Sequence, residues 1–250
     1  MCTILLAYRV AREWPVIIGN NRDEFLARSA ISPRVFTNGG SNRWLAPVDE
    51  MSGGSWWACN QSGLLVLLTN RWSGLPPDDR KVSRGHLVFD LIQHDSLSAA
   101  RQWLLAVDLA QYNPFNLLVL TCSGGFIAGN YPAFEEVSLS PGFYFIGNGP
   151  LVDDQTLKSR MARRQFNGWT KEMIDMNCIM SGFRKMLRTS IPQESIPPQG
   201  FNVKLDEYGT TSSTLLAFSD RQQPEVLCFY AAGNPLHTPY TDYSSMTLLC

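Results

Sequence analysis

The stretch GGSWWACNQSGLLVLLTN, residues 53–70, contains two apolar runs joined by a polar turn at Gln61-Ser62-Gly63. The second run, Leu64–Asn70, has apolar side chains at five successive positions, so both faces of the strand that it predicts are apolar. A strand of this kind is covered on both sides. The stretch therefore predicts a sheet inside a layered fold, with other elements packed against each of its faces.

Predicted strands and helices occur in separate runs along the rest of the chain. We expect strands at 3–8, 15–20, 53–60, 64–70, 115–122, 125–130, 142–147, 212–219 and 225–231. Helices are expected from an N-cap at Ser83 to about Gln93, after a cap at Asp95 or Ser96, and within 155–188. Residues 26–50 are expected to be irregular. Because strict βαβ alternation is absent, we predict an α+β layered architecture, and we expect a single domain over residues 1–250.

Composition narrows the classes of function. The hydrophobic fraction of 44% is enough for a sizeable core, and the balance of 21 basic and 22 acidic residues disfavours a nucleic-acid partner. We find no secretory signal and no apolar run long enough to cross a bilayer, so we expect a cytoplasmic protein without a transmembrane segment. The six cysteines lack CxxC spacing, so we expect free thiols and no catalytic metal.

Cys2 follows the initiator methionine directly. If that methionine is removed, Cys2 carries a thiol and a free α-amine whose reference pKa is near 8. The amine can then take the proton of its own side chain, as in N-terminal nucleophiles. Taken alone, Cys2 is better explained as a residue with no special role.

Polar side chains gather where the predicted strands end. Asn20–Glu24 follows the second strand, so a hairpin of the first two strands would place this cluster beside Cys2. Asp23 can hold an ammonium group, and an amide such as that of Asn70 or Asn148 can donate to an oxyanion. Each residue alone also fits a local ion pair or a turn, and the prediction rests on their combination.

The chain resembles the NRDE family, also called the Transport and Golgi organisation protein 2 family. The matching stretches are MCTILL at 1–6, NNRDEF at 20–25, GGSWWACNQSGLLVLLTNRW at 53–72, SRGHLV at 83–88, YNPFNLLVL at 112–120, GFYFIGNGPLVD at 142–153 and YGTTSSTLLAFSD at 208–220. The resemblance implies a four-layer αββα sandwich of the N-terminal-nucleophile hydrolase type. More remotely, the chain is similar to cysteine amidases that cleave bile-salt and penicillin V amides.

On the amidase comparison Cys2 matches the nucleophile, Asp23 the carboxylate that orients the amine, Asn70 the oxyanion amide and Asn148 a second site amide. The chain departs from that pattern at two positions. Asn20 stands where those amidases have an arginine, and Thr211 stands where an arginine is common in the late strand motif of both groups. An arginine there would balance charge at the thiolate or bind a substrate carboxylate, and Arg22 is a candidate substitute.

The family is also associated with haem trafficking, which needs an apolar cleft, a weak axial ligand and polar contacts to the propionates. Haem, or another amphipathic small molecule, is therefore an expected ligand, with haem-donating or haem-accepting proteins as partners. Expected contacts near the site are Asn21, Arg22, Arg71, Trp72 and His86, and further candidate iron ligands are His94 and His237.

Between these alternatives we favour a haem carrier on a hydrolase-like scaffold, because both arginines of the amidase pattern are missing. A Cys2-dependent amidohydrolase or thioesterase is the second hypothesis. A lipid-handling or acyl-thioester-handling protein remains a third.

Overall fold

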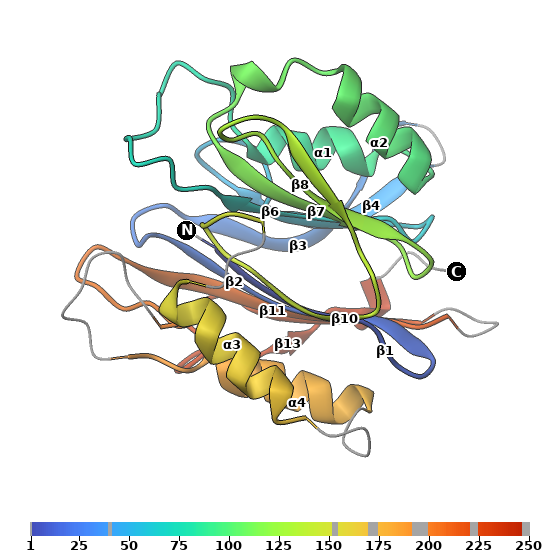
Figure 1. Cartoon of the computed structure of the whole chain (residues 1–250), viewed down its shortest axis with the longest axis vertical. Coiled ribbons are helices and arrows are strands. Elements are labelled where there is room, and N and C mark those ends of the chain that lie inside the picture. The colour runs from blue at the N-terminus through green and yellow to red at the C-terminus, as the bar shows by residue number, and fades with distance from the viewer. Residues whose placement is uncertain are drawn as a thin grey trace.

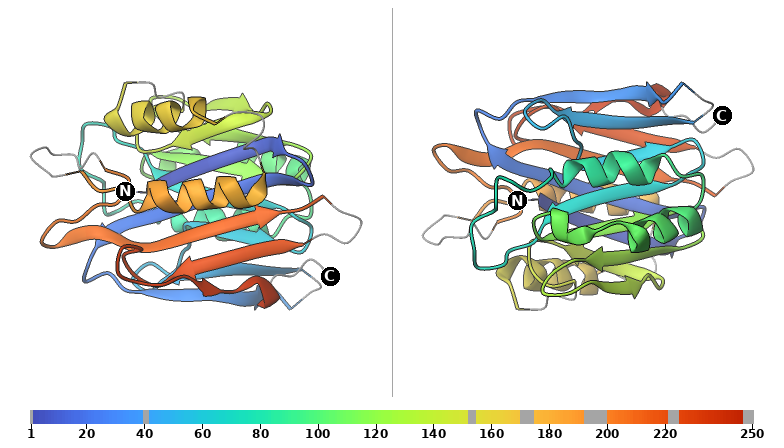
Figure 2. Two further views of the ribbon diagram at one scale, coloured as in Figure 1. Left: turned by 90° about the horizontal axis from the view of Figure 1, so that it is seen from below. Right: turned by 90° about the horizontal axis from the view of Figure 1, so that it is seen from above.

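Two antiparallel sheets stack face to face in the computed structural model, and a pair of helices covers the outer face of each sheet (Figure 1). The structure describes residues 2–39, 42–151, 155–169, 175–191, 200–220 and 225–246. This is the predicted four-layer αββα arrangement. Views from below and above show α3 and α4 across one sheet, and α1 and α2 across the other (Figure 2).

The first sheet has the order β10-β1-β2-β11-β12-β13, and the second has the order β3-β4-β5-β6-β7-β8-β9. The strands of the first sheet are β10 (Gly142–Ile146), β1 (Cys2–Ala11), β2 (Trp14–Phe25), β11 (Tyr208–Phe218), β12 (Val226–Ala231) and β13 (Thr241–Asp242). Those of the second are β3 (Ala30–Thr37), β4 (Arg43–Asp49), β5 (Trp57–Asn60), β6 (Leu65–Asn70), β7 (Phe115–Leu120), β8 (Gly125–Gly129) and β9 (Glu135–Ser138).

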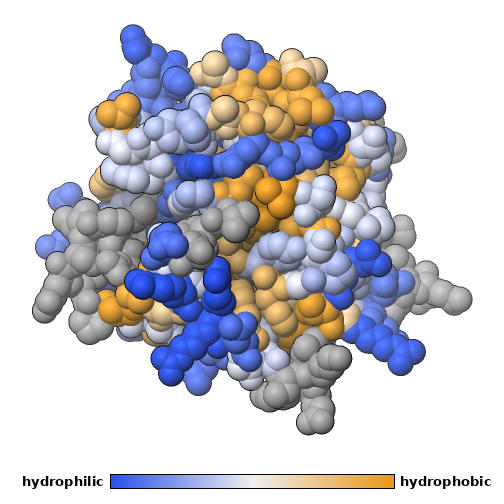
Figure 3. All heavy atoms as spheres, in the orientation of Figure 1, coloured by the Kyte–Doolittle hydropathy of each residue, from blue (hydrophilic) through white to orange (hydrophobic). Residues whose placement is uncertain are grey.

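The helices cover apolar sheet faces. They are α1 (Gly85–Ile92), α2 (Leu97–Ala106), α3 (Leu157–Asn167) and α4 (Met176–Leu187), with short 3₁₀ turns at Leu109–Gln111 and Ser244–Met246. None of the helices in the described ranges is long and apolar enough to span a membrane. On the face shown in Figure 3, apolar residues form separate patches among hydrophilic ones.

Strand β6 confirms the reading of its sequence as a doubly covered strand. Leu65 and Leu67 belong to the apolar cluster between the sheets, whereas Val66 and Leu68 belong to the cluster under α1 and α2. A third cluster lies between the first sheet and α3 and α4. The alternation of side chains along each strand therefore fills three separate interfaces.

Several details of the predicted elements are wrong or missing. Residues 26–50 are not irregular, because they form β3 and β4; Pro33 is tolerated since β3 is an edge strand with a bulge between Ile31 and Arg34. Strand β9 was not predicted. Ser83 is not the cap of α1: Arg84 occupies that position without a capping side-chain bond, whereas Ser96 does cap α2 by accepting from Ala99 N.

The cluster Asn20–Glu24 was predicted to follow a strand, but it lies inside β2, which continues to Phe25. Strand β2 is flanked by β1 and β11, so the backbone of the cluster is hydrogen-bonded on both sides. Alternation along β2 turns Asn21 and Arg22 to opposite faces of the sheet, so the cluster does not act as one group.

Candidate active site

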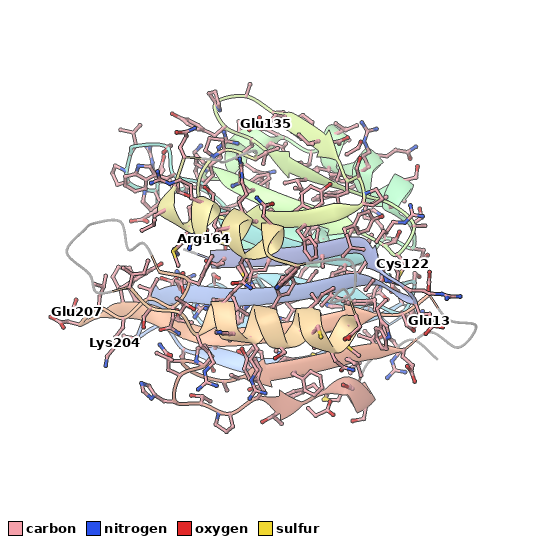
Figure 4. All side chains as sticks on the ribbon, turned by 60° about the horizontal axis from the view of Figure 1, so that its bottom comes forward. Glu13, Cys122, Glu135, Arg164, Lys204 and Glu207 are labelled. Carbon is pink, nitrogen blue, oxygen red and sulfur yellow. The ribbon has the colours of Figure 1, made fainter. Side chains whose placement is uncertain are left out.

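A small cavity of about 80 Å³ lies at the beginning of β1, where Cys2 pairs with Arg22 of β2. It is at the same end of the sheets as the start of β11, which Glu207 and Lys204 mark in Figure 4, and opposite the end marked by Glu13 and Cys122. The lining residues are Cys2, Arg22, Asp23, Glu24, Arg28, Asp49, Ser52, Gly54, Ser55, Trp56, Leu68, Asn70, Ser83, Arg84 and Gly85.

The thiol of Cys2 is held in this cavity with only 8% of the residue exposed. Burial raises the pKa of the thiol, because a thiolate is poorly solvated there, and the nearby Arg22 guanidinium offsets this only in part. The resting side chain is therefore a neutral thiol at neutral pH. It needs a proton acceptor before it can act as a nucleophile.

Asp23 is held by groups from two other elements. Its Oδ1 accepts from Thr210 Oγ1 on β11 at 2.7 Å, and its Oδ2 lies 3.8 Å from Nζ of Lys158 on α3. Burial raises the pKa of this carboxyl, and Lys158 and the Thr210 hydroxyl oppose that change. Asp23 therefore lines the cavity and also interacts with α3, in the helical layer that covers the first sheet.

Asp49, at the end of β4, anchors two arginines of the cavity. It accepts from Arg22 Nη2 at 2.5 Å, from Arg28 Nε at 2.8 Å and from the backbone N–H of Ser52 at 3.0 Å. Burial alone would raise the pKa of Asp49, but these hydrogen bonds outweigh it and leave the pKa lowered. Asp49 is therefore ionised at neutral pH and holds the cations in place.

Arg22 supplies a guanidinium to the cavity, whereas Asn20 and Thr211 stand where the amidase pattern has its arginines. Its Nη1 donates to Thr211 Oγ1 at 2.8 Å, and its guanidinium lies 4.9 Å from the centre of the Trp56 ring. Thr211 therefore serves as an acceptor for Arg22. Asn20 does not line the cavity, and its amide donates to Thr3 O at 3.0 Å.

The two asparagines predicted for the site have different positions. Asn70, at the end of β6, lines the cavity, and no partner is found for its side-chain amide among the described residues. Asn148 lies outside the cavity lining. Its Nδ2 donates to the backbone oxygen of Asn70 at 2.5 Å, and its own carbonyl accepts from Trp72 N at 2.7 Å. Asn148 thus fixes the chain segment that presents Asn70.

The other expected ligand contacts do not line the cavity. Asn21 donates to Leu187 O and Phe201 O behind the sheet, both at 2.9 Å. Arg71 pairs with Glu135 of β9, which is labelled in Figure 4. Trp72 is 69% exposed. His86 lies just outside the cavity lining, and its Nε2 is 2.9 Å from the backbone oxygen of the lining residue Ser52.

Arg84 and Asp49 are the residues that sequence reasoning missed. The stretch SRGHLV at 83–88 was noted, but only His86 was taken from it as a site residue. The position of Arg84 depends on a backbone contact: a Cβ on Gly85 would lie 2.9 Å from Ser55 N. Only glycine lets the start of α1 approach residues 54–55 this closely.

No cluster of three or more His, Cys, Asp or Glu side chains suited to a metal ion occurs within the part of the chain that the structure describes. A second hollow, of about 370 Å³, lies between α3 and α4 on the far side of the first sheet. It is lined by Met161, Arg164, Gln165, Gly168, Met186, Thr189 and Phe201, and Figure 4 labels Arg164 on α3.

Comparisons with known proteins agree with this geometry. The model of the family described as Transport and Golgi organisation 2 matches residues 1–228. No curated protein sequence matches the chain.

Three similar solved structures are amidases or hydrolases. A Caenorhabditis elegans ortholog of N-acylethanolamine-hydrolyzing acid amidase has a TM-score of 0.59 at 14% identity, covering 86% of this chain and 92% of that one. Two mutant forms of conjugated bile acid hydrolase from Clostridium perfringens have TM-scores of 0.57 and 0.56 at 9% identity, covering all of this chain and 94% of theirs. At these identities the likeness shows the fold, which is that of N-terminal-nucleophile hydrolases.

Proposed function

The chain belongs to the Transport and Golgi organisation 2 family and has an N-terminal-nucleophile hydrolase fold, and from its site we propose that it is a Cys2-dependent hydrolase of small amides or thioesters. The observation that carries the proposal is the shared cavity: the thiol of Cys2 and the side chain of Asn70 both line it, together with three arginines. Free thiols at all described cysteines favour a reducing compartment, so the proposal includes a cytoplasmic location.

The proposed reaction begins with removal of Met1, which leaves the α-amine of Cys2 free. The amine accepts the thiol proton, and the sulfur attacks the substrate carbonyl carbon. The carbonyl oxygen becomes an oxyanion, and the amide N–H of Asn70 donates to it. The amine then gives its proton to the leaving nitrogen or sulfur as the tetrahedral intermediate collapses to a thioester on Cys2. Water hydrolyses that thioester and restores the thiol.

The proposed reaction requires removal of Met1, because the buried thiol of Cys2 needs a proton acceptor. Because burial raises the pKa of the Cys2 thiol, a chain that retains Met1 has no proton acceptor built into the nucleophile. The intact mass of protein purified from cells measures this directly. We expect a mass that lacks methionine, and a mass that retains it in the natural host would contradict the proposal.

Turnover is tested with a panel of small amides and thioesters, comparing the processed wild type with Cys2→Ala. We expect loss of measurable turnover in the variant with no loss of folding, because only the sulfur is removed. Cys178→Ala is the matched control, since Cys178 is an exposed thiol on α4, and it should retain full activity. Equal turnover by Cys2→Ala and the wild type would rule out the nucleophile.

Haem carriage is a second proposal, and a specific observation favours a different place for it. Ligand pockets are typically about 300–1,000 Å³, so the 80 Å³ cavity at Cys2 is too small for haem, whereas the 370 Å³ hollow between α3 and α4 falls in that range. Met161 and Met186 offer thioethers of the kind that ligate haem iron, and Arg164 offers a guanidinium for a propionate.

A haem titration followed by the Soret band tests this proposal, together with transfer of the haem to an apo-acceptor protein. We expect a shifted band that is lost in Met161→Leu/Met186→Leu, where side-chain volume is nearly kept but the thioethers are removed. His86→Ala should bind as the wild type does, because His86 is beside the other cavity. A spectrum like that of free haem would exclude carriage.

A further inference from the structure

The cavity at Cys2 holds three arginines, and two of them are paired with carboxylates. Asp49 binds both Arg22 and Arg28, with shortest separations of 2.5 and 2.8 Å. Arg28 also lies 3.7 Å from a carboxylate oxygen of Glu24. These contacts form one ionic network of two cations and two anions along the cavity wall.

The remaining carboxylate of the cavity, that of Asp23 on β2, interacts with side chains of α3 and β11. Lys158 of α3 lies 3.8 Å from its Oδ2, and Thr210 donates to its Oδ1. Lys158 does not line the cavity. The three carboxylates of the lining are therefore matched by Arg22, Arg28 and Lys158.

Arg84 is the cation left over. Its Nη1 donates to the carbonyl oxygen of Pro114 at 3.0 Å, which is a neutral acceptor, and no ion pair of Arg84 is found among the described residues. A guanidinium has five N–H donors and stays charged in proteins. No further hydrogen-bond partner of these donors is found among the described residues, and Arg84 lines the cavity.

Arg84 lines the same cavity as Cys2. The Arg84 pKa is lowered because burial disfavours the cation and the Arg28 cation adds to this effect, while the carboxylate of Glu24 and a thiolate at Cys2 act in the opposite direction. Ser83 and Gly85, its neighbours in sequence, also line the cavity. A planar guanidinium matches a carboxylate through two parallel hydrogen bonds.

We propose that Arg84 binds a carboxylate of the substrate beside Cys2, so that the site accepts amides of the N-acyl amino acid type in preference to uncharged amides. The inference rests on the proposed function in taking Cys2 as the reacting group. It also fits the size of the site, because one water needs about 10–15 Å³ on this volume measure and 80 Å³ therefore admits a fragment of only several heavy atoms.

Measuring ligand binding to the inactive variant Cys2→Ala tests the role of Arg84 independently of turnover. Calorimetry on Cys2→Ala compares N-acetylglycine with N-acetylglycinamide, which differ in the carboxylate alone. We expect the acid to bind about ten- to a hundredfold more tightly, as for one charge-assisted pair. The preference should vanish in Cys2→Ala/Arg84→Gln and persist in part in Cys2→Ala/Arg84→Lys, which keeps the charge but loses the planar fork.

Arg80 provides the matched control. It is another arginine of the 76–84 segment, but its side chain is 90% exposed and pairs with Asp78. Cys2→Ala/Arg80→Gln should keep the full preference for the acid. Equal affinity for the two probes, no binding of the acid, or a preference that survives Arg84→Gln would each overturn the inference. Lack of Cys2-dependent turnover in the wild type, with Arg84-dependent binding intact, would instead refute the hydrolase alone.

Discussion

At the scale of single residues, charge placement in the cavity depends on Asp49. The chain has Asn20 and Thr211 where the amidase pattern has arginines; in the structure Asn20 donates to a backbone oxygen and Thr211 accepts from Arg22. The guanidinium comes from Arg22, and Asp49 holds it there at 2.5 Å. The guanidinium in this cavity is therefore held by the buried carboxylate of Asp49 and comes from a position other than the two that carry arginine in the amidase pattern.

Asp49→Asn tests this role through its effect on stability. We expect the free energy of unfolding at pH 7 to fall by about 3 kcal/mol, because Arg22 is left buried with a neutral partner. The folded-state pKa of Asp49 is lowered, so its stabilising effect is complete above the unfolded value of about 3.9 and is lost as the pH falls through the folded value. The difference from the wild type should therefore shrink below about pH 4.

Urea unfolding between pH 7 and pH 3 measures this difference. Asp206→Asn is the control, since Asp206 is an exposed residue, and its effect should stay within about 0.5 kcal/mol. A constant difference across the whole pH range would show that Asp49 acts through its shape and not through its charge.

At the scale of elements, the start of α1 is attached to residues 54–55 through a close backbone contact. A Cβ on Gly54 would be 2.6 Å from the carbonyl carbon of Gly85, and Ser55 N donates to Gly85 O at 3.1 Å. This contact sets where Ser83 and Arg84 meet the cavity. The position of a helix relative to a sheet is here decided by two glycines that face each other.

Gly85→Ala should separate these two segments. Because the new methyl group would meet backbone atoms, which cannot move out as a side chain does, we expect a loss of about 1–3 kcal/mol of stability and a lower kcat/KM for any substrate bound by Arg84. Gly142→Ala is the control, since its nearest new contact is at 3.8 Å. Denaturant unfolding of both variants measures the effect, and equal stability would contradict the account.

At the scale of the whole molecule, the two sheets are joined mainly by apolar packing, with a polar contact inside it. Trp57 of β5 is fully buried, and its indole Nε1 donates to Thr214 Oγ1 of β11 at 3.1 Å. The contact crosses from one sheet to the other. The bond helps to set the position of Trp56, next to β5, relative to Arg22 on β2, and both of these residues line the cavity.

Trp57→Phe removes this cross-sheet bond and leaves a cavity. We expect the free energy of unfolding to fall by about 2–4 kcal/mol, since a large side chain is truncated and a buried hydroxyl loses its partner. Trp72→Phe should change it by no more than about 0.5 kcal/mol, because Trp72 is 69% exposed. Thermal or denaturant unfolding compares the two, and similar losses in both would contradict a special role for the sheet interface.

The sequence by itself determined the layers. The doubly apolar β6 and the separation of strand runs from helix runs predicted an α+β layered architecture, because periodicity and apolar content are local properties of the chain. The four-layer αββα form was implied by the family resemblance. Cys2, Asp23, Arg22 and Asn70 were also predicted to share a site, and the structure brings them to one cavity. The extent of the domain, residues 1–250, stays a prediction.

Only the tertiary structure decided which neighbours in sequence act together. Asn21 and Arg22 are adjacent, yet they face opposite sides of β2, where one binds backbone oxygens near α4 and the other enters the cavity. Arg84 and Asp49 come from distant parts of the chain and line the same cavity as Cys2, Arg84 beside a close glycine contact and Asp49 at a strand end. Such positions depend on how the two sheets and their helices pack, which no local pattern of residues records.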